Sequence, residues 1–166
     1  MSESSARLAV DGAGDAKIDT GVPAVDHLLA LLARYGGFDL ALEVAPGPEE
    51  AEVAAAGRAL GEALAAPLRA PGARGHGAGA LPADEALAHV SLDVADEPAV
   101  FSNADLSEAR VGGIDGDLVA AFLRELAEGA GMNLHVRLVE GEDARHVLEA
   151  IFKSLGSALG EACLAR

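Results

Sequence analysis

Apolar positions recur along the chain with two different periods. Spacings of three and four residues predict helices over 23–36, 49–64, 117–128 and 143–164. Alternation of apolar and polar positions predicts strands over 6–10, 16–19, 38–44, 86–94, 97–103 and 133–139. The Gly- and Pro-rich segment 66–82 is predicted to be a connection or a loop. Helices and strands are interleaved throughout, which indicates a mixed α+β class.

The second half of the chain repeats the order of the first. Residues 59–64 (ALGEAL) match residues 154–159 (SLGSAL), an offset of 154 − 59 = 95. A short apolar helix beside an open sheet cannot bury its apolar face alone, so the two copies are expected to pack pseudo-symmetrically. The predicted halves are residues 1–80, which include the Gly/Pro-rich loop, and residues 81–166. Together they are expected to form a single compact unit.

The charge of the chain narrows the choice of partners. Its 166 residues include 27 Asp and Glu against 12 Lys and Arg, a net charge of -15, which repels nucleic-acid phosphates and anionic lipid headgroups. No apolar run reaches the roughly 20 residues that span a bilayer. The single cysteine, Cys163, cannot form an intrachain disulfide, which suits a reducing compartment. We therefore expect a cytoplasmic protein without nucleic-acid or membrane partners.

Among the five histidines, His135 and His146 are the best candidates for a metal site. His146 and Glu149 lie three residues apart on one helical face, and imidazole and carboxylate ligands suit Mn, Fe, Co or Zn. An exposed or capping histidine beside a solvated glutamate is the alternative. His135 alternates with apolar neighbours on a strand, so it faces solvent or a subunit contact, and a metal site there would have to be shared. His27 follows Asp26, which could orient the imidazole ring, or the pair could be structural.

Four segments, taken in order, resemble the imidazoleglycerol-phosphate dehydratase family. They are residues 20–27 (TGVPAVDH), 84–87 (DEAL), 131–137 (GMNLHVR) and 146–153 (HVLEAIFK). The resemblance covers nearly the whole chain. It implies a manganese-dependent hydro-lyase of histidine biosynthesis, which removes water from imidazoleglycerol phosphate to give imidazoleacetol phosphate. It also implies an internally duplicated α/β sandwich of two half-domains, like domain 2 of ribosomal protein S5, with sheets packed against helices.

The resemblance assigns roles to individual residues. In the family, a His-His-x-x-Glu type motif in each repeat and two further histidines hold two metals between subunits. The remaining ligands here are His27, His135, His146 and Glu149, and Glu149 is also the candidate catalytic residue. Arg110 and Lys153 match the family's contacts to the substrate phosphate. The resemblance further implies a homo-oligomer, either a trimer or a 24-mer-like assembly.

Several family positions carry other residues in this chain. The first motif is replaced by Glu50 and Ala51 in place of its histidines and by Ala54 and Ala55 in place of its carboxylates. Arg145 stands in place of the first histidine of the second motif, and its positive charge disfavours a divalent ion. The family's first strand would lie upstream of Met1 and its Ser/Lys tail beyond Arg166, so the chain is either naturally short or truncated.

These substitutions leave two hypotheses for function. The first is a family member that keeps the fold and the oligomer surfaces but has impaired or no dehydratase activity, with manganese weakly bound or absent. Such a protein would serve as a structural or regulatory partner of an authentic dehydratase subunit, or would bind a small phosphorylated ligand. The alternative is a functional dehydratase with a minimal metal site. Whether the chain is an enzyme stays open on the sequence alone.

Overall fold

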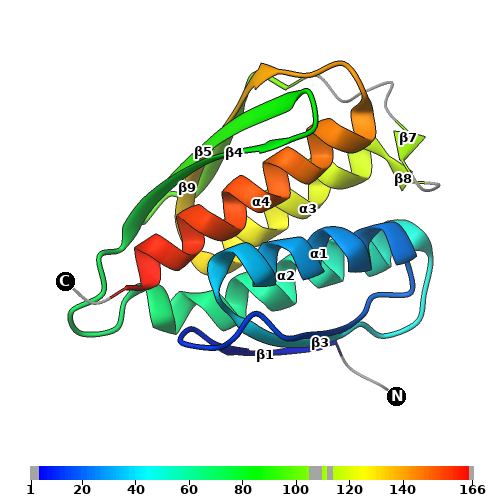
Figure 1. The fold of residues 1–166 in the computed structure, drawn as a ribbon. Helices are drawn as coiled ribbons and strands as arrows, with labels where there is room; N and C mark the ends of the chain where they lie inside the picture. The colour runs from blue at the N-terminus through cyan, green and yellow to red at the C-terminus, as the bar shows by residue number, and fades with distance from the viewer. Residues whose placement is uncertain (1–3, 105–109, 112–113, 165–166) are drawn as a thin grey trace.

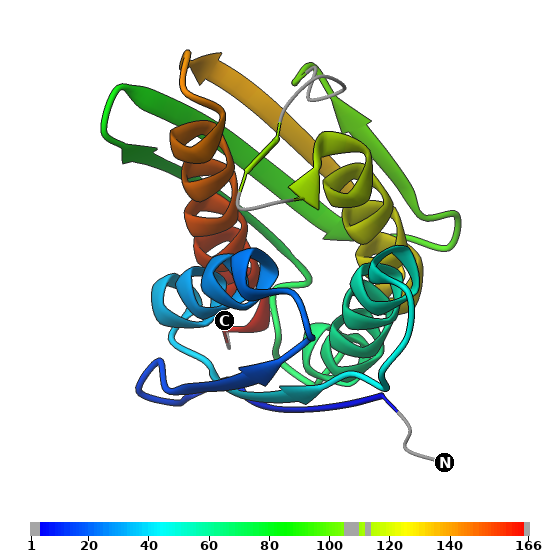
Figure 2. The ribbon, with the colours of Figure 1, turned by 90° about the vertical axis from the view of Figure 1, so that its right-hand side faces the viewer.

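The computed structural model describes residues 4–104, 110–111 and 114–164. In chain order its elements are β1 (Ser5–Ala9), β2 (Ala16–Asp19), α1 (Pro23–Gly36), β3 (Asp39–Glu43), α2 (Glu49–Leu68), β4 (His76–Ala83), β5 (Ala86–Val94), β6 (Ala99–Ser102), β7 (Arg110–Val111), β8 (Ile114–Asp115), α3 (Gly116–Ala130), β9 (Met132–Glu140) and α4 (Ala144–Cys163). The long helices lie between two sheets, with α1 and α2 against the first and α3 and α4 against the second (Figure 1, Figure 2). This arrangement confirms the predicted α+β class.

The two large sheets repeat one topology. The first has the strand order β1-β3-β2, in which β3 is antiparallel to β1 and parallel to β2. The second has the order β4-β5-β9-β6, in which β9 is antiparallel to β5 and parallel to β6. Strands β1, β3 and β2 therefore correspond to β5, β9 and β6. Strand β4, antiparallel to β5, has no counterpart in the first sheet among the described residues.

Local sequence fixes the ends of the helices in both repeats. Pro23 occupies the first turn of α1, where the missing N–H costs no helical hydrogen bond. Helices α1 and α3 end at Gly37 and Gly131, with φ of 70° and 72°, a left-handed conformation that glycine adopts without strain. The N-cap of α4 is Asp143, whose carboxylate accepts hydrogen bonds from the backbone N–H groups of Arg145 and His146.

Glycines allow the helices to pack closely in two parallel pairs. A Cβ on Gly61 of α2 would lie 2.5 Å from the Leu126 carbonyl oxygen of α3. A Cβ on Gly160 of α4 would lie 2.7 Å from the Gly36 carbonyl oxygen of α1. The α1–α4 and α2–α3 pairs are thus related by the internal repeat, and the first pair places the start of α1 beside the first turns of α4 (Figure 1).

The prediction of a loop over residues 66–82 is wrong in two places. Helix α2 continues to Leu68, and residues from His76 onward form β4. Glycine is required in this strand because a Cβ on Gly79 would lie 2.6 Å from the Ser154 carbonyl oxygen of α4. Pairing with β5 assigns β4 to the second sheet, although the predicted boundary between residues 80 and 81 falls inside it. No helix in the described ranges is long and apolar enough to cross a membrane.

Candidate functional site

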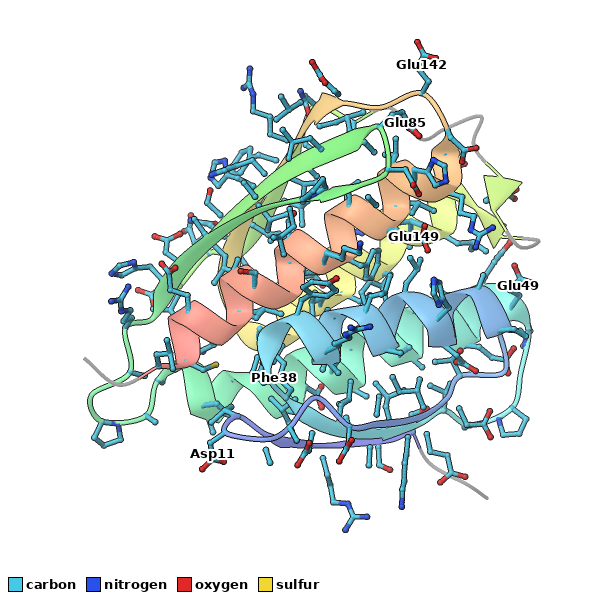
Figure 3. The ribbon with its side chains drawn as sticks, in the orientation of Figure 1. Asp11, Phe38, Glu49, Glu85, Glu142 and Glu149 are labelled. Atoms are coloured by element: carbon cyan, nitrogen blue, oxygen red, sulfur yellow. The ribbon has the colours of Figure 1, made fainter. Side chains whose placement is uncertain are left out.

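One group of candidate residues lies where α1 meets α4. His27 Nε2 is 2.8 Å from Glu149 Oε2, a hydrogen bond between residues 122 positions apart. The Glu149 side chain is 15 % exposed, whereas the His27 ring is 53 % exposed. Arg145 places its Nε 4.0 Å from Glu149 Oε1 and is otherwise directed to solvent. Figure 3 shows Glu149 on the side of α4 that faces α1. A half-buried carboxylate is therefore held between an imidazole and a guanidinium.

His146 lies on the same helix but contacts different residues. Its Nδ1 forms a short hydrogen bond with Glu85, and its Nε2 is 3.2 Å from Asp84 Oδ2. Both carboxylates belong to the turn between β4 and β5, where Asp84 has a φ of 52° (Figure 3 labels Glu85). The hydrogen bond with Glu85 raises the pKa of His146, and the same bond lowers the pKa of Glu85. His146 is therefore held by this turn and does not converge with Glu149.

His135 lies on the outer face of the second sheet. Its ring stacks on the exposed Phe101 of β6, with ring centroids 4.8 Å apart and planes inclined by 25°. Its neighbours across the sheet are Ser91 of β5 and Phe101 of β6. Because the helices cover the opposite face of this sheet, the structure does not bring His135 together with His27, His146 or Glu149. The sequence-based expectation that a site at His135 is shared with another chain stays a prediction.

Of the two residues predicted to contact the substrate phosphate, the structure describes the side chain of Lys153 but not that of Arg110. Lys153 Nζ donates a hydrogen bond to the Pro82 carbonyl oxygen at 3.3 Å. It also lies 5.3 Å from the centroid of the Tyr35 ring, a cation–π distance. Lys153 is four residues beyond Glu149 and shares its helix face. The backbone of Arg110 lies in β7, but its side chain falls outside the described residues.

The replaced family positions lie at the start of α2. Glu50 and Ala51 are exposed in the first turn, and Ala54 and Ala55 are half-buried one turn later. The offset of 95 residues pairs Glu50 with Arg145, because 50 + 95 = 145. By the same offset, Ala51 and Ala54 of α2 correspond to His146 and Glu149 of α4, so methyl groups stand at these two positions in the first repeat.

The donor set does not match two metal positions within one chain. Among the described residues no three His, Cys, Asp or Glu side chains are grouped so that they could hold a metal ion. One group offers His27 and Glu149, with the Arg145 guanidinium beside them, and the other offers His146, whose ring nitrogens already face two carboxylates. Two manganese ions therefore do not fit the described residues of a single copy.

Sequence reasoning gave Asp84 and Glu85 no role in the site. In the sequence they stand out only as part of the DEAL segment that carries the resemblance. Their contact with His146 spans 61 residues between Glu85 and His146, so no local spacing predicts it. Complementary charge at the start of α4 and in an acidic turn was the only signal in the sequence.

The fold and the grouped side chains define a duplicated α+β sandwich with imidazole and carboxylate groups at the starts of its helices. A family profile described as imidazoleglycerol-phosphate dehydratase matches residues 20–159. The chain therefore belongs to the imidazoleglycerol-phosphate dehydratase family of histidine biosynthesis.

Individual relatives agree with this assignment. The chain is 41% identical to the imidazoleglycerol-phosphate dehydratase of Desulforudis audaxviator over 161 residues, which cover 94% of this chain and 82% of that protein. It is 41% identical to the enzyme of that name from Syntrophobacter fumaroxidans, covering 95% and 82% of the two chains.

Solved structures of the family share the fold. The crystal structure of imidazoleglycerol-phosphate dehydratase from Staphylococcus aureus has a TM-score of 0.86 and 31% identity, covering 98% of this chain and 95% of that chain. The structure of IGPD from Pyrococcus furiosus in complex with (S)-C348 has a TM-score of 0.83 and 29% identity, covering 96% and 89%. The predicted sandwich of sheets and helices is confirmed.

Proposed function

We propose that this chain acts in histidine biosynthesis as an imidazoleglycerol-phosphate dehydratase with a reduced site. The observation that carries the proposal is the hydrogen bond of 2.8 Å between His27 and Glu149. These residues come from different repeats, and each matches a family position on its own helix. Close relatives named for this activity support the same assignment.

Dehydration requires a base for the carbon-bound proton and an acid for the departing hydroxyl. Glu149 is suited to accept the proton, because it is largely shielded from water and the His27 ring orients its carboxylate. The hydroxyl takes this proton back from the Glu149 carboxyl, directly or through the His27 ring, and leaves as water, so that Glu149 is again a carboxylate; the resulting enol becomes the ketone of imidazoleacetol phosphate. Lys153 supplies the positive charge for the substrate phosphate, on the same helix face as Glu149.

Manganese is the metal that the family resemblance implies, and its chemistry when bound would be to polarise the substrate imidazole. The described residues of one copy do not fit two such ions. We expect His135 of a second copy to complete the site, since this ring faces outward from the sheet. A homo-oligomer, either a trimer or a 24-mer-like assembly, is therefore part of the proposal. We place it in the cytoplasm, where the lone thiol of Cys163 would stay reduced.

A second candidate function is favoured by the residues that replace ligands. Arg145 brings a guanidinium within 4.0 Å of Glu149, and alanines 51, 54 and 55 have no donor atoms. These features favour a protein that keeps the fold without the dehydration reaction. It would then bind a small phosphorylated ligand through Lys153 and Arg110, or associate with an authentic dehydratase subunit.

The first test combines metal content, particle size and turnover on one preparation. Protein purified without chelators is analysed by mass spectrometry for manganese, sized by light scattering, and assayed with imidazoleglycerol phosphate and added Mn²⁺. We expect formation of imidazoleacetol phosphate that is lost in Glu149→Gln. Turnover should persist in the matched Glu43→Gln variant, which changes an exposed carboxylate of β3. An intact oligomer that shows no turnover under these conditions would refute the dehydratase proposal in favour of the second candidate.

A further inference from the structure

Tyr35 is a partly exposed aromatic side chain in the last turn of α1, close to two cationic side chains. Its exposed fraction is 38 %. Lys153 Nζ of α4 lies 5.3 Å from the centroid of the Tyr35 ring, and Arg34 Cζ lies 5.8 Å from it. Both distances fall within the roughly 6 Å at which the face of an aromatic ring attracts a cation. The ring therefore holds positive charge at one place in a chain of net charge -15.

The Lys153 ammonium is also held from the side of the second sheet. Helix α4 lies between α1 and β4 (Figure 1), and Lys153 Nζ donates a hydrogen bond of 3.3 Å to the Pro82 carbonyl oxygen of β4. An ammonium group has three N–H donors, so two remain for an anion after this bond. The last turn of α1 is the negative end of its helix dipole, which favours a cation beside Tyr35. The half-buried Lys153 side chain is thus fixed between two neighbouring elements.

Fixing a lysine before a ligand arrives changes its affinity for that ligand. Ordering a flexible side chain on binding weakens affinity by about twofold to tenfold, and a side chain that is already ordered avoids much of this loss. The described contacts of Tyr35 with Lys153 and Arg34 are made by the ring and not by the hydroxyl. Phenylalanine should therefore be able to replace Tyr35, and an aliphatic side chain should not.

We propose that Tyr35 is a positioning residue that holds the Lys153 ammonium ready for the phosphate of the substrate. The proposal rests on the proposed function, in which Lys153 binds that phosphate. Tyr35 acts through Lys153 and contacts no reacting atom. Its effect should consequently appear in the binding of phosphate and in KM, and not in kcat.

The composition of the chain makes the contact measurable. Its two lysines are Lys17 and Lys153, and Tyr35 is its single tyrosine. Lys17 is exposed on β2 and serves as an internal control. In protein labelled with ¹³C-lysine, NMR therefore shows two ε-methylene signals. The ring current of Tyr35 should move the Lys153 signal upfield of the Lys17 signal.

Two variants at position 35 separate the ring from its bulk. Tyr35→Leu removes the aromatic face, and the matched Tyr35→Phe keeps it. We expect the upfield shift of Lys153 to be lost in Tyr35→Leu and retained in Tyr35→Phe. During titration with inorganic phosphate, the Kd reported by the Lys153 signal should rise by about twofold to tenfold in Tyr35→Leu only. KM for imidazoleglycerol phosphate should rise by a similar factor, with kcat nearly unchanged.

A double-mutant comparison tests whether Tyr35 acts through Lys153. In Lys153→Met, where KM is already raised, Tyr35→Leu should raise it no further, and circular dichroism checks that all variants fold. The proposal is overturned if Lys153 does not respond to phosphate, or if Tyr35→Leu keeps the parent affinity. It is also overturned if Tyr35→Phe loses affinity as Tyr35→Leu does, or if Tyr35→Leu raises KM equally in Lys153→Met.

The phosphate titration needs no turnover, so the two proposals can fail separately. The expected pattern of shifts and affinities in a protein without turnover would support the role of Tyr35 and refute the dehydratase proposal alone. Normal turnover with a Tyr35→Leu variant that matches the parent in phosphate affinity and KM would refute the role of Tyr35 alone.

Discussion

Replacing Gly156 with valine tests whether the close packing of α1 on α4 holds the candidate site together. An ideal Cβ on Gly156 would lie 2.9 Å from the Leu32 Cα and 3.0 Å from the Leu32 carbonyl carbon. Carbon atoms prefer separations of about 3.5–4.0 Å, so the two helices would have to move apart by roughly 0.5–1 Å. Both neighbouring atoms belong to the backbone, and no side-chain rotation relieves the contact.

The cost follows from two opposing effects. Overpacking of this kind destabilises by about 1–3 kcal/mol, and valine at a rigid helix crossing belongs at the upper end. The better helix propensity of valine relative to glycine offsets only about 0.4 kcal/mol of this. For a chain of this length, a net loss of about 2–3 kcal/mol lowers Tm by roughly 4–12 °C.

Thermal unfolding followed by circular dichroism measures the change. The control is Gly47→Val, because a Cβ at Gly47 meets only the Ala51 Cβ, at 4.0 Å. Separation of α1 from α4 should also lengthen the contact between His27 and Glu149, which is visible as a shift of the His27 ring resonances in NMR. A Tm for Gly156→Val within about 1 °C of the parent would show that the helix crossing is not rigid, and the reasoning would fail.

Three further predictions concern individual side chains. Glu85→Gln should return the raised pKa of His146 toward its usual value, as measured in an NMR titration. In the parent protein, the hydrogen bond between Glu85 and His146 stabilises the fold only between the two pKa values. Its contribution is lost as pH rises through the raised pKa of His146 and as pH falls through the lowered pKa of Glu85. Arg145→His adds a third donor beside Glu149 and should increase bound Mn²⁺ or Zn²⁺ per chain by mass spectrometry, whereas Arg145→Gln, which only removes charge, should not. Burial raises the pKa of the Cys163 thiol to about 11, so a thiol reagent at pH 8 should label it only slowly until the chain is denatured.

The start and end of α1 could be predicted because their signals are local: Pro23 and Gly37 fix them through their own backbone preferences. The predicted ends of α2 and α3, at residues 64 and 128, fall short of the observed ends at Leu68 and Ala130. Strand β4 could not be predicted in the same way. Its residues are Gly, Ala, Pro, Leu and His without regular alternation, and they become a strand because they pair with β5 and lie against the backbone of α4.

In the candidate site, too, local features could be predicted from the sequence and long-range contacts could not. The spacing of His146 and Glu149 correctly indicates a shared helix, but the structure directs them to different partners. His146 meets a turn 61 residues earlier, and Glu149 meets a histidine 122 residues earlier. These contacts form because α1 and the β4–β5 turn pack on α4, so the periodicity of the sequence cannot predict them. The family resemblance pointed to His27 and Glu149 through the motif that each belongs to on its own helix, and not through any spacing between the two residues.

The same structure explains how family ligands can be replaced without loss of the fold. Ala51 and Arg145 lie in exposed first turns, and Ala54 and Ala55 are only half-buried, so none of them fills the core. The helix crossings depend instead on glycines such as Gly61 and Gly160, which contact backbone atoms of the neighbouring helix. Substitution at a solvent-facing helix start removes a donor atom but leaves those backbone contacts intact. A TM-score of 0.86 to a family structure is therefore compatible with a different metal content, and activity has to be established at Glu149 and His27 themselves.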